Sequence, residues 1–206
     1  MYKKMVLIYD VETKWYGNYD TREDELRTIS LYDVEEKKMF FYTYKQKDEI
    51  QRLFDQHKII IGFNNWAYDD PIIKKAGIDL RYHINIDLYE VVKKRGRYIG
   101  LPEGTSLSLS NIAKKLGLTQ NKTSFDYKLL LKDEWTEEEI KLIREYNEQD
   151  VRVTTELYEK LIIFFERFKE LLSPSDQENM SWLKSSMSHA GDRILNFVQM
   201  QTNGYF

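Results

Sequence analysis

The sequence predicts one mixed α/β domain in which three antiparallel strands are extended by parallel strands joined through helices. Two short and fully apolar runs, at 5–9 and within 57–64, are typical of buried strands. The runs 26–33 and 39–44 are joined by the polar link VEEKK, which predicts a hairpin. Helical patterns separate the later strands, so we expect a mixed five-stranded sheet flanked by helices.

The later elements follow from periodicity and from turn residues. Helices are expected at 48–56, 70–76 and 87–95, a last short strand at 84–86, and a glycine-rich loop at 96–106. SLSNIAKKLGL (108–118) predicts a further short helix.

A capping-box pattern, Thr136 with Glu139, opens a long helix over about 137–171, and Ser173-Pro174 ends it. We expect one domain over 1–172. Residues 173–206, with a helix at about 176–200, are expected to form a C-terminal helical extension that could lead into a further domain.

Composition limits the class of protein. The chain has 206 residues, 42% of them hydrophobic, which is enough for a core of its own. A net charge of −3 gives no global basic field, so a nucleic-acid-binding chain would need local cations. The densest cationic cluster either contacts phosphates or is a solvated helix end: Lys93, Lys94, Arg95 and Arg97.

Several chemistries and locations are excluded or disfavoured. The chain has no cysteine, which excludes disulfides, thiol catalysis and cysteine-ligated zinc. No apolar run is long enough to span a bilayer, so no membrane association is expected. The apolar run after the basic start reaches Asp10 too early for a signal peptide. We therefore expect a cytoplasmic location.

The first pair of candidate acids, Asp10 and Glu12, follows the run 5–9 with one residue between them. Alternate residues of a strand share a face, so both carboxylates should point the same way at the end of this strand. Two such charges repel each other unless a cation lies between them, and oxygen ligands suit Mg²⁺ or Mn²⁺. The alternative is a solvent-exposed pair at a strand end.

A third acid, Asp69, comes seven residues after Gly62, where the second apolar strand ends. The carboxyl ends of parallel strands meet at one edge of the sheet, where open α/β sheets bind ligands. Asp69 is therefore expected near Asp10. Alternatively, Asp69 caps the helix that begins near Pro71, a role that Asp70 could also fill.

Tyr146 and Asp150 lie four residues apart in the predicted long helix and hence on one face. The apolar positions of this helix indicate that the face turns inward: Ile140, Ile143, Val153 and Leu157. A lone buried carboxylate is costly, so Asp150 needs a partner. That partner is either a metal ion shared with Asp10 and Glu12 or a nearby Lys or Arg.

Taken together, these residues resemble the DEDD exonuclease superfamily on a ribonuclease H-like fold, in its tyrosine-bearing branch. The three motifs are YDVET at 9–13, GFNNWAYDDP at 62–71 and YNEQD at 146–150. The second motif matches the branch's Asn-x-x-x-aromatic-Asp pattern, and its three matching residues are Asn64, Tyr68 and Asp69.

The connecting segments are similar to the proofreading domain of family B DNA polymerases. IDLYEVV at 86–92 and SLSLSNIAKKLGL at 106–118 carry this similarity, as does the spacing of strands, hairpin and helix. The resemblance covers about residues 3–165 and leaves the C-terminal residues unexplained.

The resemblance implies hydrolysis of phosphodiester bonds at a 3′ end with two divalent ions, Mg²⁺ or Mn²⁺. By this resemblance Asp10 bridges both ions, and Glu12 and Asp150 complete the site of the ion that activates water. Asp69 holds the second ion through water, and the Tyr146 hydroxyl orients the attacking water.

Residues near the acidic motifs are expected to bind the substrate strand. The resemblance places Thr13 beside the terminal nucleotide and Asn64 along the strand. Trp66 is a better candidate than Tyr68 for stacking on bases, because Tyr68 suits the core equally well. The loop 14–25 either contacts the substrate or is an ordinary hairpin extension, and it holds further aromatic residues: Trp15, Tyr16 and Tyr19. The histidines lack metal-ligand spacing and are expected to be structural or on the surface: His57, His83 and His189.

The likeness to DNA editing domains favours the 3′ end of single-stranded DNA as substrate, although the same kind of site also trims RNA. It is compatible with a stand-alone nuclease or with the proofreading part of a polymerase. A polymerase domain or another replication or repair protein is then the expected partner. The hypothesis from a different class is a nucleic-acid-binding module with an inactive site. All five site residues are present, which favours an enzyme.

Overall fold

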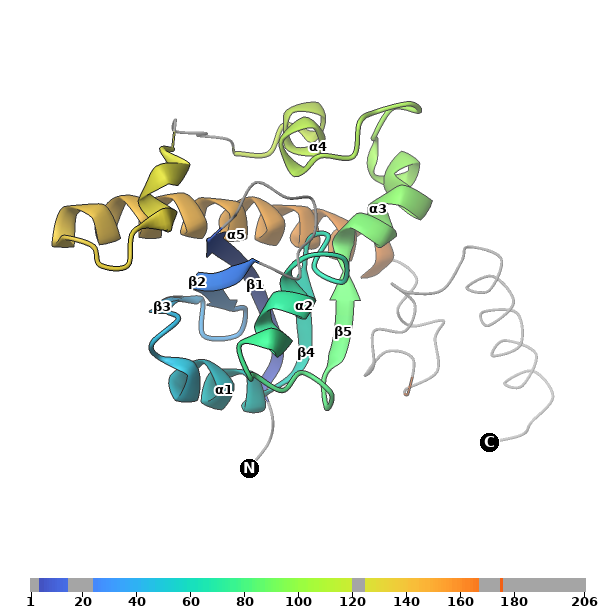
Figure 1. Ribbon diagram of the computed structural model, residues 1–206. Coiled ribbons are helices and arrows are strands. Elements are labelled where there is room, and N and C mark those ends of the chain that lie inside the picture. Colours follow the sequence, from blue (N-terminus) through green and yellow to red (C-terminus); the bar gives the residue numbers. More distant parts are fainter. Residues whose placement is uncertain (1–3, 15–23, 120–124, 167–174, 176–206) are drawn as a thin grey trace.

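A five-stranded mixed sheet forms the centre of the computed structural model, which describes residues 4–14, 24–119, 125–166 and Ser175 (Figure 1). The strand order is β3-β2-β1-β4-β5. The strands are β1 (Lys4–Lys14), β2 (Glu25–Asp33), β3 (Lys38–Thr43), β4 (His57–Gly62) and β5 (Ile84–Asp87). β1, β2 and β3 pair antiparallel, whereas β4 and β5 add in parallel to β1. The predicted fold class is confirmed.

Five α-helices and two 3₁₀ helices surround this sheet in the part of the chain that the structure describes. They are α1 (Lys47–Asp55), α2 (Asp69–Lys75), α3 (Leu88–Arg95), η1 (Gly96–Ile99), α4 (Leu109–Leu116), η2 (Tyr127–Leu131) and α5 (Glu137–Glu166). η1 lies in the predicted loop 96–106, and η2 was not predicted. None of the helices in the described ranges combines the length and the apolar character that crossing a membrane requires.

Some expectations fall outside the described residues. These are the end of the long helix beyond Glu166, the helix at 176–200, the C-terminal extension 173–206 and the middle of the loop 14–25. Whether residues 1–172 form one domain stays a prediction.

The two faces of β1 pack into two separate cores. Val6 and Ile8 belong to the core shared with α3, α4 and α5. Leu7, Tyr9 and Val11 belong to the core shared with α1 and α2. Because side chains alternate along a strand, the next even-numbered positions continue the face that α5 covers. Position 10 is therefore the first on that face to carry an acid rather than an apolar side chain.

The strand that carries the first two acids is longer than the sequence predicts. We expected a strand at 5–9 ended by Asp10, but β1 continues to Lys14. Its parallel pairing with β4 ends at Ile8, opposite Ile61, whereas its antiparallel pairing with β2 continues to Lys14. β2 thus holds the end of β1 in extended form. The acids lie within a strand that has lost its neighbour on one side.

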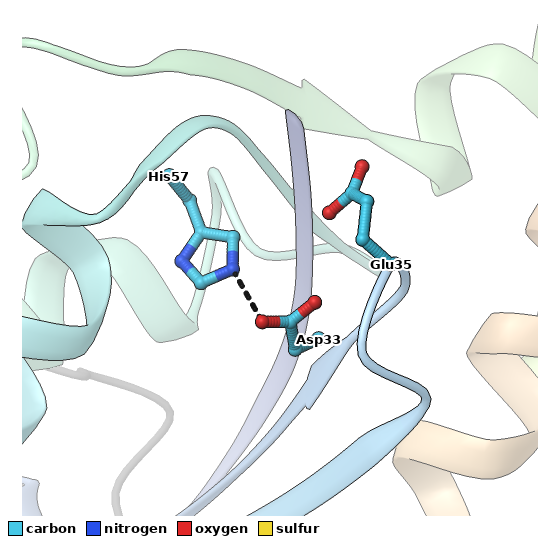
Figure 2. A group of neighbouring side chains, drawn as sticks. All are labelled: Asp33, Glu35 and His57. Atoms are coloured by element: carbon cyan, nitrogen blue, oxygen red, sulfur yellow. Dashed lines mark ion pairs between the residues drawn. The ribbon is translucent and has the colours of Figure 1, made fainter. Parts of the chain in front are cut away.

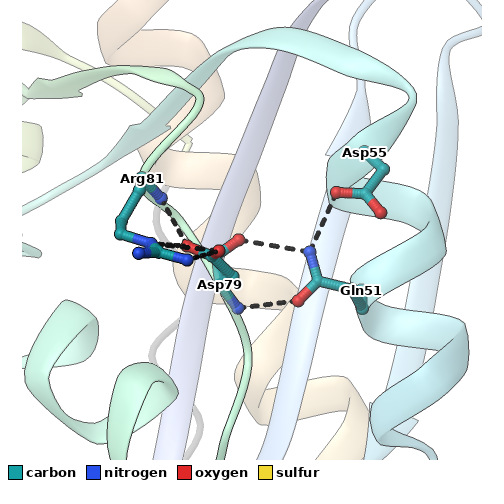
Figure 3. A network of polar contacts seen from close by, with 4 residues as sticks. All are labelled: Gln51, Asp55, Asp79 and Arg81. Carbon is teal, nitrogen blue, oxygen red and sulfur yellow. Dashed lines mark hydrogen bonds and ion pairs between the residues drawn. The ribbon is translucent and has the colours of Figure 1, made fainter.

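The connection between α2 and β5 is held by side chains that bond to backbone groups. The Gln51 amide on α1 donates to the Asp79 carbonyl oxygen (3.1 Å) and to the Asp55 carboxylate (2.9 Å), and its oxygen accepts from the Asp79 nitrogen (2.7 Å) (Figure 3). Arg81 in turn donates to the Asp79 carboxylate. These contacts hold the α2–β5 connection against α1.

A buried contact between His57 and Asp33 ties β4 to β2 (Figure 2). It lies at the end of the sheet away from Asp10, because Asp33 is opposite Leu7 and His57 is opposite Lys4. His57 Nδ1 donates to the Leu53 carbonyl oxygen at 2.8 Å, and its Nε2 lies 3.3 Å from Asp33 Oδ2. The other Asp33 oxygen accepts from the Glu36 nitrogen at 2.9 Å. Glu35 brings a third ligand atom to within 4.8 Å, but it is exposed. His57 is thus a buried residue that joins two strands.

The predicted capping box fixes the beginning of α5. The Thr136 nitrogen donates to Glu139 Oε2 at 3.0 Å, and the Glu139 nitrogen donates to Thr136 Oγ1 at 3.2 Å. These two bonds satisfy backbone donors that have no partner within the helix.

Replacing Thr136 by Ala is expected to lower the free energy of unfolding by about 1 kcal/mol, because one of these bonds is lost. Urea denaturation followed by circular dichroism measures this change. Thr119→Ala removes the same atoms from an exposed residue outside this capping box, and we expect an effect below about 0.5 kcal/mol. Equal effects of the two substitutions would show that the capping box contributes nothing specific.

Candidate functional site

Three carboxylates converge where β1 passes under α5. Asp10 and Glu12 come from β1 and Asp150 from α5, and their ligand atoms all lie within 4.8 Å of one another. Asp10 and Asp150 are half-buried, and Glu12 is nearly buried. The solvent-exposed pair at a strand end, the alternative for Asp10 and Glu12, does not describe this arrangement. The structure brings together three of the four predicted acidic residues in one group.

The electrostatics of this group favour a bound cation. Burial raises the pKa of Asp10 well above its usual range, and the charges of Asp69, Asp150 and Glu12 raise it further. Burial likewise raises the pKa of Glu12, with Asp150 and Asp69 adding to the effect. Clustered carboxylates in a low dielectric stay ionised together only if a positive charge compensates them. An all-oxygen donor set of this kind fits Mg²⁺ or Mn²⁺.

The fourth acid, Asp69, lies beside this group without joining it. It is the first residue of α2, is buried, and accepts the Val11 backbone N–H at 3.1 Å. Val11 lies beyond the last β1–β4 pair, so the carboxylate takes the place of the strand that has ended. Burial raises the pKa of Asp69 to about 7, although its bond from Val11 opposes the shift.

The helix-cap alternatives for Asp69 and Asp70 are wrong. The residue that precedes α2 is Tyr68, and its side chain makes no capping bond. Asp70 instead accepts hydrogen bonds from the Tyr9 hydroxyl and from Asn85 Nδ2 (2.7 Å). Both acids are thus engaged by strand residues, which hold the start of α2 against the sheet.

The turn that leads into α2 depends on a close backbone approach and on one unusual residue. A Cβ on Gly62 would lie 2.6 Å from Asn65 Cβ, so no larger residue fits there without movement. Asn64 has a φ of 60°, a left-handed conformation that Asn tolerates better than most residues. The Asp87 carboxylate accepts the N–H groups of Asn64 (2.8 Å) and Trp66 (3.3 Å) and so fixes this turn.

The side chains of Asn65 and Asn85 form a hydrogen-bond network next to the same turn. Asn65 Nδ2 donates to the Tyr9 hydroxyl and to Asn85 Oδ1, both at 2.8 Å. The Trp66 ring nitrogen donates to the same Asn85 oxygen at 3.1 Å. Through these bonds β1, β5 and the turn are joined, and the Trp66 ring is held in place although 47% of its surface is exposed.

Tyr146 lies beside the acids and inside a group of aromatic rings. Its hydroxyl is 2.6 Å from the Tyr127 hydroxyl, and its ring stacks on Phe125 at a centroid distance of 4.3 Å. Burial raises the pKa of Tyr146 well above its usual value, and the Tyr127 bond and the charges of Glu12 and Asp150 raise it further. The hydroxyl therefore stays protonated at neutral pH.

Asn147 was not predicted from the sequence as a site residue, although it lies inside the third motif. Asn147 is fully buried and donates to Asp10 Oδ2 at 2.9 Å and to the Asp10 carbonyl oxygen at 3.2 Å. Its own oxygen accepts from Thr28 Oγ1 at 3.4 Å. Asn147 and Asp150 are three residues apart and share a face, so a polar side chain there was a signal that could have found it.

The residues predicted to bind the substrate differ in their exposure to solvent. Thr13 is buried, and its hydroxyl is 2.8 Å from the Tyr68 hydroxyl, whose pKa burial raises to about 12. Asn64 and Trp66 are exposed. Trp15, Tyr16 and Tyr19 lie outside the described residues.

The predicted cationic cluster lies at the C-terminal end of α3. Lys93 and Lys94 are exposed, and both pair with Glu90. Together with Arg97 they line a pocket that also includes Glu103. Paired lysines on a helix are what the solvated-helix interpretation describes. A role in contacting phosphates stays a prediction.

Comparison with known protein families decides the family of this chain. A model of the RNase H superfamily matches residues 7–162, which is more than half of the sequence. The chain belongs to the RNase H superfamily. No curated protein matches the sequence.

Solved structures share this RNase H-like fold. The family B DNA polymerase from the hyperthermophilic archaeon Pyrobaculum calidifontis is similar with a TM-score of 0.62 and 18% identity over 88% of this chain and 27% of that chain. Exonuclease I gives a TM-score of 0.54 with 15% identity over 81% of this chain and 42% of that chain. An ExoI/SSB-Ct complex gives 0.52 with 15% identity over 81% and 43%. The chain therefore spans less than half the length of each, and identities this low establish the fold alone.

The raised pKa of Asp69 makes the stability of this RNase H-like fold depend on pH. The folded chain keeps a proton up to pH about 7, whereas the unfolded chain releases it near pH 4. The contribution of protonated Asp69 to the free energy of unfolding is therefore fully present below pH about 4. It is lost as pH rises to about 7.

Replacing Asp69 by Asn keeps the oxygen that accepts from Val11 but removes the charge. We expect the variant to gain stability relative to the wild type as pH rises from 5 to 7, by on the order of 1 kcal/mol or more. Urea unfolding in EDTA at several pH values measures the difference. A difference that stays constant across this range would contradict the assignment.

Proposed function

We propose that this chain is a metal-dependent 3′→5′ exonuclease that trims the 3′ end of single-stranded DNA. One observation carries the proposal. Three carboxylates from β1 and α5 gather their ligand atoms within 4.8 Å, next to a tyrosine whose pKa their charges raise. The RNase H family and the fold shared with exonuclease I support a nuclease.

The proposed mechanism uses two divalent cations, and Asp10 would contribute to the ligand groups of both. Asp10, Glu12 and Asp150 are the residues that would hold the first, and Asp10 with Asp69 the second. When bound, such ions activate water and stabilise charge on the phosphoryl and leaving oxygens. Because Asp69 already accepts from Val11 at 3.1 Å, its contact to an ion would run through water or use its other oxygen.

The side chains of the site orient the reactants. Asn147 holds the Asp10 carboxylate in one direction through its bond of 2.9 Å. Tyr146 stays protonated because its pKa is raised, so its hydroxyl positions the attacking water rather than removing a proton from it. The water oxygen bonds to the terminal phosphorus as it releases a proton to solvent, and the bond from phosphorus to the 3′ oxygen of the preceding nucleotide breaks. That oxygen takes up a proton from solvent, so the shortened strand ends in a 3′ hydroxyl and a nucleoside 5′-monophosphate leaves.

Exposed residues of the second motif, which also contains Asp69, support a single-stranded substrate. Trp66 presents nearly half of its surface, and its ring is fixed by Asn85. An aromatic side chain of this kind stacks on any base, at about 1–3 kcal/mol per base, without reading sequence. Asn64 lies two residues away and is exposed. DNA is the proposed polymer because the motifs resemble those of DNA editing domains, and a polymerase or other replication protein is the proposed partner.

The decisive experiment follows a 5′-labelled single strand on a sequencing gel. We expect stepwise shortening with Mg²⁺ and none with EDTA. Asp10→Ala and Asp150→Ala are each expected to lower the rate by at least about 10²-fold, because each removes a ligand that stabilises the transition state. Glu159→Ala, an exposed acid on the same helix as Asp150, is the matched control and should trim at the wild-type rate.

Other outcomes separate the competing hypotheses. Unchanged trimming by both site variants would show that the activity does not belong to this site. A wild type that binds the strand without shortening it would support a binding module instead. An RNA strand of the same sequence, tested in parallel, identifies an exoribonuclease if it alone is trimmed.

A further inference from the structure

The geometry points to Tyr127 as a positioning residue that holds the hydroxyl of Tyr146 in its working direction. Tyr127 lies in η2, outside the three acidic motifs. This inference rests on the proposed function, because it assigns a partner to the tyrosine of that site. In this role Tyr127 binds neither a metal ion nor a base, and it affects the reaction only through Tyr146.

Tyr127 is presented by a well-anchored turn. Asp126 Oδ1 accepts from the Lys128 nitrogen at 3.1 Å and caps η2. The Trp135 ring nitrogen donates to the Leu129 carbonyl oxygen at 2.7 Å, and Leu130 is buried beneath the turn. The Tyr127 side chain is 58% exposed, so burial of its ring does not explain its place. Its hydroxyl nevertheless meets the Tyr146 hydroxyl at 2.6 Å.

Phe125 fixes the ring of Tyr146 but leaves its hydroxyl free to turn. The two rings are nearly parallel, with an interplanar angle of 10°, and Tyr127 contacts both edge-on at 5.3 and 5.8 Å. A phenol hydroxyl prefers the plane of its ring and has one proton together with acceptor lone pairs. Stacking therefore decides where the oxygen lies, whereas a hydrogen-bond partner decides where its proton and lone pairs point.

Without Tyr127 the strongest acceptors near the Tyr146 hydroxyl are carboxylates. The charges of Glu12 and Asp150 are close enough to raise the pKa of Tyr146. A protonated hydroxyl beside such groups would donate to one of them and turn away from the water it should orient. In the arrangement we infer, the Tyr146 hydroxyl donates to the Tyr127 hydroxyl at 2.6 Å, so its proton is not available to the carboxylates and its lone pairs can accept from the water. Tyr127 thus prevents an unproductive internal bond.

A different role would predict different kinetics. If Tyr127 stacked on the substrate, its ring would matter and its hydroxyl would not, and the loss would appear in KM. A positioning role depends on the hydroxyl alone and appears in kcat. Tyr127→Phe keeps the ring and its contacts with Phe125 while removing the oxygen, so it separates the two roles.

The test is a double-mutant cycle of Tyr127→Phe and Tyr146→Phe, measured as single-strand trimming with Mg²⁺. In the wild-type background, Tyr127→Phe should lower kcat by about three- to tenfold, the effect of one lost neutral hydrogen bond, with KM changed less than about twofold. In the Tyr146→Phe background, the same substitution should have no further effect, because the hydroxyl that it holds is gone. Tyr82→Phe, which alters a tyrosine that is 77% exposed, should match the wild type.

Each result bears on the inference. Equal losses in both backgrounds, or a loss confined to KM, would overturn it while leaving the exonuclease proposal intact, as would a Tyr127→Phe variant that trims like the wild type. A wild type that fails to trim overturns both proposals together. A folding defect in Tyr127→Phe would add the same loss in both backgrounds and would cancel from the coupling between the two substitutions, so this coupling decides the inference. Melting temperatures of all variants identify such a defect directly.

Discussion

The mutual repulsion of buried carboxylates is the constraint on which this structure depends. Asp10, Glu12 and Asp150 bring three negative charges into a partly buried space, and Asp69 adds a fourth nearby. The raised pKa values of Asp10 and Glu12 express the cost of this arrangement. A fold gains nothing in stability from such a group, which is why it indicates function. A bound cation makes the electrostatic energy of this group favourable, because each carboxylate then attracts the cation.

The site lies where β1 still pairs with β2 but no longer pairs with β4. β4 stops pairing with β1 at Ile8, whereas β2 carries β1 on to Lys14. The extended backbone therefore continues past the core, with Asp10 and Glu12 on the face that α5 covers. On the side that β4 has left, Asp69 accepts the unpaired Val11 N–H. A backbone N–H that a neighbouring strand would otherwise bond thus holds Asp69 at the site.

Local pattern was sufficient for the five strands, for the α-helices and for the shared faces of the acids. Apolar runs identified β1 and β4, the polar VEEKK link identified the β2–β3 hairpin, and period-two alternation placed Asp10 and Glu12 on one face. The capping box at Thr136 identified the start of α5, and helical spacing put Tyr146 with Asp150. These features depend on neighbours within a few residues, which a single sequence displays.

What was missed depends on partners far apart in the chain. The true end of β1 is set by β2, which no local pattern near Asp10 reveals. Asn147 has its role only because α5 lies against β1, 137 residues away in sequence from Asp10. Tyr127 lies in a short apolar 3₁₀ turn with no periodicity, so neither η2 nor its contact with Tyr146 could be predicted. The orientation of Asp69 likewise follows from where β4 ends.

A crystal of the wild-type chain grown with Mn²⁺, with anomalous scattering data recorded at the manganese edge, tests the central claim most directly. We expect two anomalous peaks about 3.5–4 Å apart, enclosed by Asp10, Glu12 and Asp150, with Asp69 near the second. Well-ordered carboxylates at saturating Mn²⁺ with no anomalous peak between them would contradict the account.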